Sequence, residues 1–287
     1  MAKLENFSGL TRPQEDLLKK YYCFGSLALV NVNVVNDKFT FHTRLSERHS
    51  ENPRASAWLQ FKNDFLLVKG KKRNDKFSHY KLELTPSKLL QNVKAMFECK
   101  LVADGSPVDA TLNVEYNHEK FKTKLSYLTA KNALRLQETF GTGERGLGLD
   151  VKLDVESLSV SDHVTAFWWF KNNTRLVLKH VGKSFSTFGD FEVSYLHGVS
   201  DVANIASKVV TKWASRITSV EVGGDYKYDE NTWLKGKLNS DGRLALAVTR
   251  TVTPNLRASV ATELAAQSLL AHHSDNYRFG LRFDFSQ

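Results

Sequence analysis

The chain has 287 residues, of which 41% are hydrophobic and 25% are charged, and it carries a formal net charge of +9. No window approaches the roughly 18 consecutive apolar residues that a transmembrane helix needs, so a helical membrane protein is excluded. Composition does not exclude a membrane-spanning β-barrel, because its strands alternate lipid-facing and lumen-facing residues and are only moderately hydrophobic on average.

The N-terminal segment 1–25 is predicted to contain one short amphipathic helix. Thr11 and Gln14 stand three positions apart in a capping-box arrangement with an early-turn proline between them. Lys19 and Lys20 follow at the end of the helix, where the helix dipole favours positive charge. No apolar region with a small-residue cleavage site precedes the helix, so we expect no secretory signal.

The apolar side chains of this helix share one stripe. Its members are Leu10, Leu17, Leu18 and Tyr21. Two positions of the helix would bury these apolar side chains. The helix lies on the membrane surface, or it lies inside a barrel with the stripe on the wall and with Arg12, Lys19 and Lys20 facing the lumen. The sequence alone does not decide between them.

Residues 26–287 show a side-chain period of two in short segments that polar connections separate, which is the pattern of β-strands. Nineteen strands are predicted, over 26–34, 38–45, 55–62, 64–70, 77–84, 90–100, 110–117, 121–129, 134–141, 145–154, 164–170, 174–181, 190–198, 201–210, 217–228, 232–239, 243–252, 256–265 and 277–286.

The length of these segments favours a membrane barrel over a soluble β-sandwich. At about 3.3 Å per residue, a strand of about 10 residues tilted by roughly 45° rises a little over 20 Å, close to the apolar band of about 25 Å on a membrane barrel. Strands of soluble proteins have about 5 or 6 residues. We therefore expect an all-β transmembrane barrel over 26–287, with 1–25 as helix and linker.

Three features resemble the mitochondrial voltage-dependent anion channel family. Residues 16–25, Asp-Leu-Leu-Lys-Lys-Tyr-Tyr-Cys-Phe-Gly, lead from the helix to the first strand, and the number and spacing of the strands fit. The last strand fits the family's insertion signal, which is polar, any, glycine, hydrophobic, any, hydrophobic, any, hydrophobic. The signal residues here are Arg278, Gly280, Leu281, Phe283 and Phe285.

The resemblance implies a barrel of the mitochondrial outer membrane whose first and last strands pair in parallel and whose helix lies in the pore. It implies contact with membrane lipids and passive exchange of ATP, ADP, phosphate and other small anions, and it is compatible with a homo-oligomer or a larger membrane complex. Leu10 falls where the family has the leucine that holds the helix to the wall. Lys20 falls on the helix-terminal lysine, and Gly25 on the hinge.

The chain also departs from the family pattern. Tyr21 and Cys23 stand where linker glycines are expected, which stiffens the hinge, so the sequence does not decide whether the channel gates with voltage by helix movement. The nucleotide motif Gly-Leu-Lys is represented by Asn92, Val93 and Lys94, so the lysine is retained without its glycine. The lipid-facing glutamate of some members has no counterpart in 64–69.

Selectivity is expected to come from cations on the polar phase of the strands, because lysine and arginine rings favour anions over a screened distance of about 8 to 10 Å. The polar phase also carries carboxylates, at Glu115, Asp150, Glu221 and Asp225, that offset these cations. The predicted lumen cations are Arg44, Lys94, Lys122, Lys124, Lys152, Arg175, Lys179, Lys227, Lys235, Lys237, Arg257, Arg278 and Arg282.

The remaining motifs predict no chemistry. Residues 141–146 match G-x-G-x-x-G but run into a strand, so we expect a turn there and no dinucleotide site. The basic run 69–73 is expected to be a solvated loop, and His272 and His273 lack a third metal ligand. Cys23 and Cys99 are expected to be unpaired structural thiols. We expect no enzyme activity, no cofactor and no nucleic-acid partner.

Two other functions stay open at this stage. The related protein-import pore generally has a longer N-terminal extension and a more acidic lumen than this chain. A porin-like barrel can also serve as a structural subunit of a larger mitochondrial membrane complex, with its lumen plugged or unused. The tyrosine in place of a hinge glycine fits the structural role slightly better.

Overall fold

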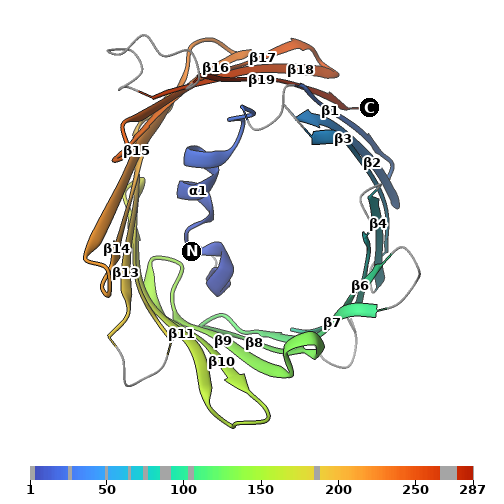
Figure 1. The fold of residues 1–287 in the computed structure, drawn as a ribbon, viewed down its shortest axis with the longest axis vertical. Coiled ribbons are helices and arrows are strands. Elements are labelled where there is room, and N and C mark those ends of the chain that lie inside the picture. Colours follow the sequence, from blue (N-terminus) through green and yellow to red (C-terminus); the bar gives the residue numbers. More distant parts are fainter. Residues whose placement is uncertain are drawn as a thin grey trace.

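The computed structural model describes residues 4–24, 28–48, 51–63, 66–73, 77–84, 92–102, 107–183, 188–265 and 277–286. Within these residues, nineteen strands form a single closed sheet around a lumen, and one short helix lies inside the ring (Figure 1). The predicted fold class is therefore confirmed.

The observed strands coincide with the predicted ones, most within a few residues at either end. Their bounds are β1 Ala28–Val35, β2 Phe39–Arg48, β3 Glu51–Lys62, β4 Leu66–Arg73, β5 Phe77–Leu84, β6 Val93–Val102, β7 Pro107–Asn117, β8 Phe121–Leu128, β9 Ala133–Gly141, β10 Arg145–Asp154, β11 Val160–Lys171, β12 Thr174–Gly182, β13 Asp190–Ser200, β14 Ala203–Lys212, β15 Ile217–Lys227, β16 Thr232–Asn239, β17 Arg243–Thr253, β18 Leu256–Ala265 and β19 Tyr277–Ser286.

The barrel closes through its first and last strands. β1 pairs in parallel with β19, with Ala28 opposite Leu281 and Val32 opposite Phe285, whereas successive strands pair antiparallel. An odd number of strands in an up-and-down barrel requires one such parallel pair. Closure leaves no open sheet edge, which lipid contact demands, because unpaired backbone groups have no water to bind there.

The period-two pattern separates two faces of the wall. Phe279 and Phe285 of β19 stand exposed on the outer face, in the position where lipid surrounds a membrane barrel. On the inner face, Asn31 of β1 donates to Asp284 of β19 at 2.6 Å, across the closing pair. Trp168 and Trp169 of β11 confirm the same division, because Trp168 is buried inside and Trp169 is exposed outside.

The N-terminal segment settles the choice between surface and lumen. A single 3-10 turn η1 (Phe7–Gly9) leads into α1 (Arg12–Lys19), and α1 contacts β13, β14 and β15 from inside the barrel (Figure 1). In this view α1 lies nearer to the side of the ring formed by β13 to β15 than to the side formed by β1 to β4. No helix of the described residues is long and apolar enough to cross a membrane.

The predicted capping box is wrong. The Thr11 side chain makes no bond to the helix backbone, and instead donates to Glu15 Oε1 at 3.2 Å and accepts from Lys179 Nζ at 2.9 Å. Gln14 is buried, and its amide has no hydrogen-bond partner among the described residues. Contact with the wall therefore takes the place of local capping.

The predicted solvated loop over 69–73 is also wrong, because these residues continue β4 to Arg73. Their main chain pairs with β3 and β5. Lys69 and Lys71 lie with their ammonium groups 5.6 and 5.3 Å from the ring centre of Trp58, which stacks on His42. By contrast, the turn expected at 141–146 is present between β9 and β10.

Candidate functional site: the barrel lumen

The N-terminal end of the interior segment is packed against the wall through an apolar cluster. Leu10 is fully buried and shares this cluster with Phe7 and Trp168. Phe7 fits because Gly148 of β10 has no side chain, since a Cβ at that position would lie 2.8 Å from the Phe7 ring. Leu10 thus occupies the place predicted for the helix anchor, and its energetic role stays a prediction.

The C-terminal half of α1 has a second apolar contact. Leu17 and Leu18 are buried against Ala206 of β14, with Leu196 of β13 beside them. The predicted apolar stripe therefore faces the barrel wall both at Leu10 and at Leu17 and Leu18. A helix held at two separate places has little freedom to swing into the pore as a rigid body.

Beyond α1, Tyr21 lies at the centre of what we call the tyrosine cluster, which comprises Tyr21, Lys20, Lys235, Arg257 and Arg282. The Lys20 and Lys235 ammonium groups lie 5.3 and 5.8 Å from the Tyr21 ring centre, and the Arg282 guanidinium lies 5.0 Å from it. Arg257 donates to the Tyr21 hydroxyl at 3.0 Å. One ring therefore joins the linker to β16, β18 and β19.

Tyr21 reaches this position with a backbone φ of +71°. This is the left-handed region, which costs a non-glycine residue roughly 1 kcal/mol or more. Tyr21 therefore adopts a conformation that is easier for glycine, and its side-chain contacts offset the strain.

The next two residues extend the attachment. The Lys237 ammonium lies 4.9 Å from the Tyr22 ring centre, and the Cys23 thiol donates to the Gly280 carbonyl of β19 at 3.2 Å. Burial raises the pKa of the Cys23 thiol above its ordinary value, so the thiol stays protonated as this bond requires. Both cysteines are free, as predicted. The hinge residue Gly25 lies outside the described residues.

Most predicted selectivity cations turn out to have carboxylate partners. The pairs are Arg12–Asp16 at 3.9 Å, Lys19–Glu15 at 3.3 Å, Lys94–Glu83 at 3.5 Å, Lys124–Glu115 at 3.2 Å, Lys152–Asp162 at 3.5 Å, Arg175–Glu5 at 2.7 Å, Lys179–Glu192 at 3.8 Å, Lys237–Glu221 at 2.7 Å and Arg278–Glu263 at 3.5 Å. Each pair is nearly neutral when seen from more than a Debye length away.

Sequence reasoning missed several of these acidic partners. Glu83, Glu98, Glu192 and Glu263 all lie on the inner face and pair with cations, and only their place in the polar phase of the strands could have revealed them. Lys122 lies near the N-terminal segment, where it lines a small hollow with Phe7. Most of the predicted lumen cations are thus paired with carboxylates, and a smaller group of cations lies around Tyr21.

That smaller group borders the space open to solutes. Two lumen hollows, of about 460 and about 360 Å³, are both lined by Lys20, Tyr21 and Arg257. Lys235 lies in the first hollow with Asp225, and Arg282 lies in the second with Asp284, to which it is paired at 2.8 Å. Lys235 lies 3.5 Å from a helix carbonyl, that of Asp16.

Comparison with known proteins agrees with this architecture. The sequence profile of the family described as eukaryotic porin matches residues 5–280 of the chain. The chain belongs to this family. Among curated relatives of this porin, the mitochondrial outer membrane protein porin 2 of Arabidopsis thaliana is 23% identical over 280 residues, covering 96% of this chain and 95% of the relative. Porin 4 of the same plant is 24% identical and covers 92% of both chains.

A third relative, the mitochondrial outer membrane protein porin of Candida albicans, is 22% identical and covers 92% of this chain and 93% of its own. Among solved structures, a mutant of the Rh. blastica porin aligns with a TM-score of 0.53 and 8% identity, over 88% of this chain and 97% of that one. That likeness shows the barrel fold alone. The family and these relatives thus indicate that this eukaryotic porin is a channel of the mitochondrial outer membrane rather than an enzyme.

Proposed function

We propose that this porin prefers anions, with ATP, ADP, phosphate and other small anionic metabolites as its permeants, and that its helix stays on the wall during conduction. The observation that carries the proposal is the tyrosine cluster, where Lys20, Lys235 and Arg257 border the open lumen. The two anchored ends of α1 and the linker contacts support the fixed helix.

The size of the expected preference follows from simple electrostatics. An anion about 8 Å from one of these cations gains about 0.5 kcal/mol in water, and screening over one Debye length reduces the sum for three cations to about 0.6 kcal/mol. Potassium is disfavoured by the same amount in the same field, so the two ions differ by about 1.2 kcal/mol, which corresponds to roughly an eightfold preference of chloride over potassium. A wide, wet pore with mostly paired charges has no cause for a larger ratio.

The test is reconstitution in planar bilayers under a potassium chloride gradient. The unmodified porin is expected to give large current steps and a reversal potential of anionic sign. The double variant Lys235→Gln with Arg257→Gln is expected to lower the ratio to about twofold, because Lys20 alone of the three cations remains. A control, Lys131→Gln, removes an exposed cation from the turn after β8 and is expected to leave the ratio unchanged.

The possible outcomes separate the rival functions. Cation preference in the unmodified protein contradicts the proposal and supports a protein-import pore. Insertion without current also contradicts it and supports a structural subunit. If the double variant keeps the parent's ratio, the tyrosine cluster does not set the selectivity.

A further inference from the structure

One strand of the wall turns a carboxylate towards the lipid. In β9, Arg135 reaches inwards to Asp150, and Thr139 donates to a backbone carbonyl of the interior N-terminal segment at 3.1 Å. Because side chains alternate along a strand, the other phase of β9 faces outwards. That phase contains Glu138 and the exposed Phe140.

The strand register places Glu138 in a row of mixed polarity on the outer face. Its cross-strand neighbours are Thr123 on β8 and Leu149 on β10, and Leu149 pairs in turn with Thr165 on β11. Thr123 donates to one oxygen of Glu138 at 3.2 Å. The next row towards the β9–β10 turn is entirely apolar. Its members are Phe121, Phe140, Leu147 and Phe167.

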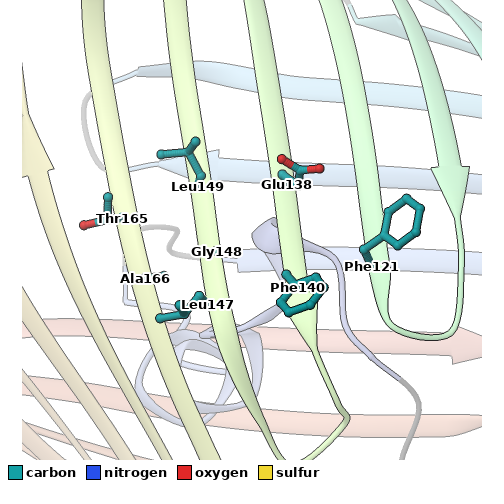
Figure 2. A pocket seen from close by; sticks show the side chains of 8 residues that line it. All are labelled: Phe121, Glu138, Phe140, Leu147, Gly148, Leu149, Thr165 and Ala166. Atoms are coloured by element: carbon teal, nitrogen blue, oxygen red, sulfur yellow. The ribbon is translucent and has the colours of Figure 1, made fainter.

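These two rows line an open groove of about 600 Å³ on the outside of the barrel. Figure 2 shows the Glu138 carboxylate between Leu149 and Phe121, with Phe140 and Leu147 on the side of the strand ends and the interior segment behind the strands. The groove is therefore mostly apolar with one acidic group, and its volume suits part of a lipid molecule.

The depth of Glu138 makes its charge costly. It stands three residues before Gly141, the last residue of β9, which is about 10 Å along the strand and about 7 Å below the barrel edge at a tilt of roughly 45°. A carboxylate in this part of a bilayer needs a partner. The bond from Thr123 satisfies one oxygen but leaves the negative charge in place.

A cation at the barrel edge completes the pattern. Arg145 is the first residue of β10 and lies exposed on the same outward phase, four residues from Leu149. Because Leu149 pairs with Glu138, the backbone positions of Arg145 and Glu138 are about 13 Å apart along the strand direction. Both side chains are long enough to reach towards each other, so the remaining gap between their charged groups suits a zwitterionic headgroup. Arg145 suits a phosphate and Glu138 suits an ammonium group.

We propose that Glu138 and Arg145 form a lipid site for a phospholipid with a primary ammonium headgroup, the chemistry of phosphatidylethanolamine. The ammonium donates to Glu138 and cancels its charge, the phosphate meets Arg145 at the edge, and the hydrocarbon lies on Phe140 and Leu147. A sterol hydroxyl would leave the charge uncompensated. A choline headgroup carries the charge but has no hydrogen to donate.

The experiment measures which lipids stay bound to the porin. The full chain is reconstituted in equal parts of phosphatidylethanolamine and phosphatidylcholine with matched acyl chains, extracted in mild detergent, and examined by native mass spectrometry. We expect the unmodified porin to retain the ethanolamine lipid about fivefold over the choline lipid, because both headgroups carry the positive charge but only the ethanolamine can donate a hydrogen bond to Glu138. Glu138→Gln is expected to bring this ratio to about one, and Arg145→Gln to lower the retention of both lipids.

The control is Asp162→Asn, which removes an exposed carboxylate from the lumen side of β11 and is expected to keep the parent's ratio. Folding is not at risk in Glu138→Gln, because a lipid-facing charge is removed. Equal retention by the unmodified porin, or an unchanged ratio in Glu138→Gln, overturns the proposal. The proposal is also overturned if added sterol displaces the ethanolamine lipid from the unmodified porin but not from Glu138→Gln. Conductance is expected to be the same in all variants but Asp162→Asn, so the outcome does not depend on the proposed permeants.

Discussion

Replacing Tyr21 with alanine removes the ring that joins the linker to the wall of the lumen. Lys20 adjoins Tyr21 in the chain and moves with it, so the Lys20 contact does not resist opening. Lys235 and Arg282 do resist it, at about 0.5 kcal/mol each for partly exposed cation–π contacts. The hydrogen bond from Arg257 adds about 1 kcal/mol. The free energy of linker opening should fall by about 2 kcal/mol, which raises the open population about 30-fold.

The native thiol of Cys23 provides the assay. It is half-buried and bonded to the Gly280 carbonyl, so maleimide reaches it only when the linker leaves the wall. In a Cys99→Ala background, which leaves one thiol, the alkylation rate of the reconstituted porin reports opening directly. We expect Tyr21→Ala to raise the rate about 30-fold and Tyr21→Phe, which loses only the bond to Arg257, about fivefold.

The matched control is Tyr226→Ala, which removes an exposed tyrosine from the outer face of β15. It is expected to leave the rate unchanged. If Tyr21→Ala labels within twofold of its parent, the cation contacts do not hold the linker, and the reasoning is refuted.

Three further outcomes are expected. Leu10→Asn puts an amide into a fully buried apolar contact, which should loosen α1 by about 2 to 4 kcal/mol and accelerate amide hydrogen exchange over residues 12–19; unchanged protection would show that Leu10 is not an anchor. Gly148→Leu occupies the space of Phe7 and should expose the N-terminal segment to protease without opening the barrel, as judged by an unchanged far-UV spectrum. Burial raises the pKa of the Cys23 thiol above its ordinary value of 9.0. The bond from this thiol should therefore be fully present below pH 9.0 and be lost as the pH rises through the raised pKa. Current fluctuations should grow at alkaline pH, and this growth should be absent in Cys23→Ser.

The strands were predictable because a period of two needs only local sequence. The pattern predicts each lipid-facing residue of β19 and the opposite directions of Trp168 and Trp169. The charge of the basic run 69–73 favours a solvated loop, whereas in the barrel alternate lysines of this run face a wet lumen at no great cost.

The charge balance of the lumen could not be read from the sequence in the same way. Lys94 meets Glu83, eleven positions earlier in the chain, and Lys237 meets Glu221, because the register between neighbouring strands brings them together. Register depends on turns and on the whole sheet, so a count of inward cations overstates the field. The sequence also contained Glu138 in the apolar phase of 134–141, and the meaning of that position becomes clear only from its neighbours on β8 and β10.

The linker attachment has a consequence for how the molecule is assembled. Cys23 bonds to the strand that is synthesised last, and Arg282 of the same strand contacts Tyr21. The linker precedes all nineteen strands in the chain, yet it can make these two contacts only after β19 has formed. An attached linker is therefore a sign that the C-terminal strand is in place.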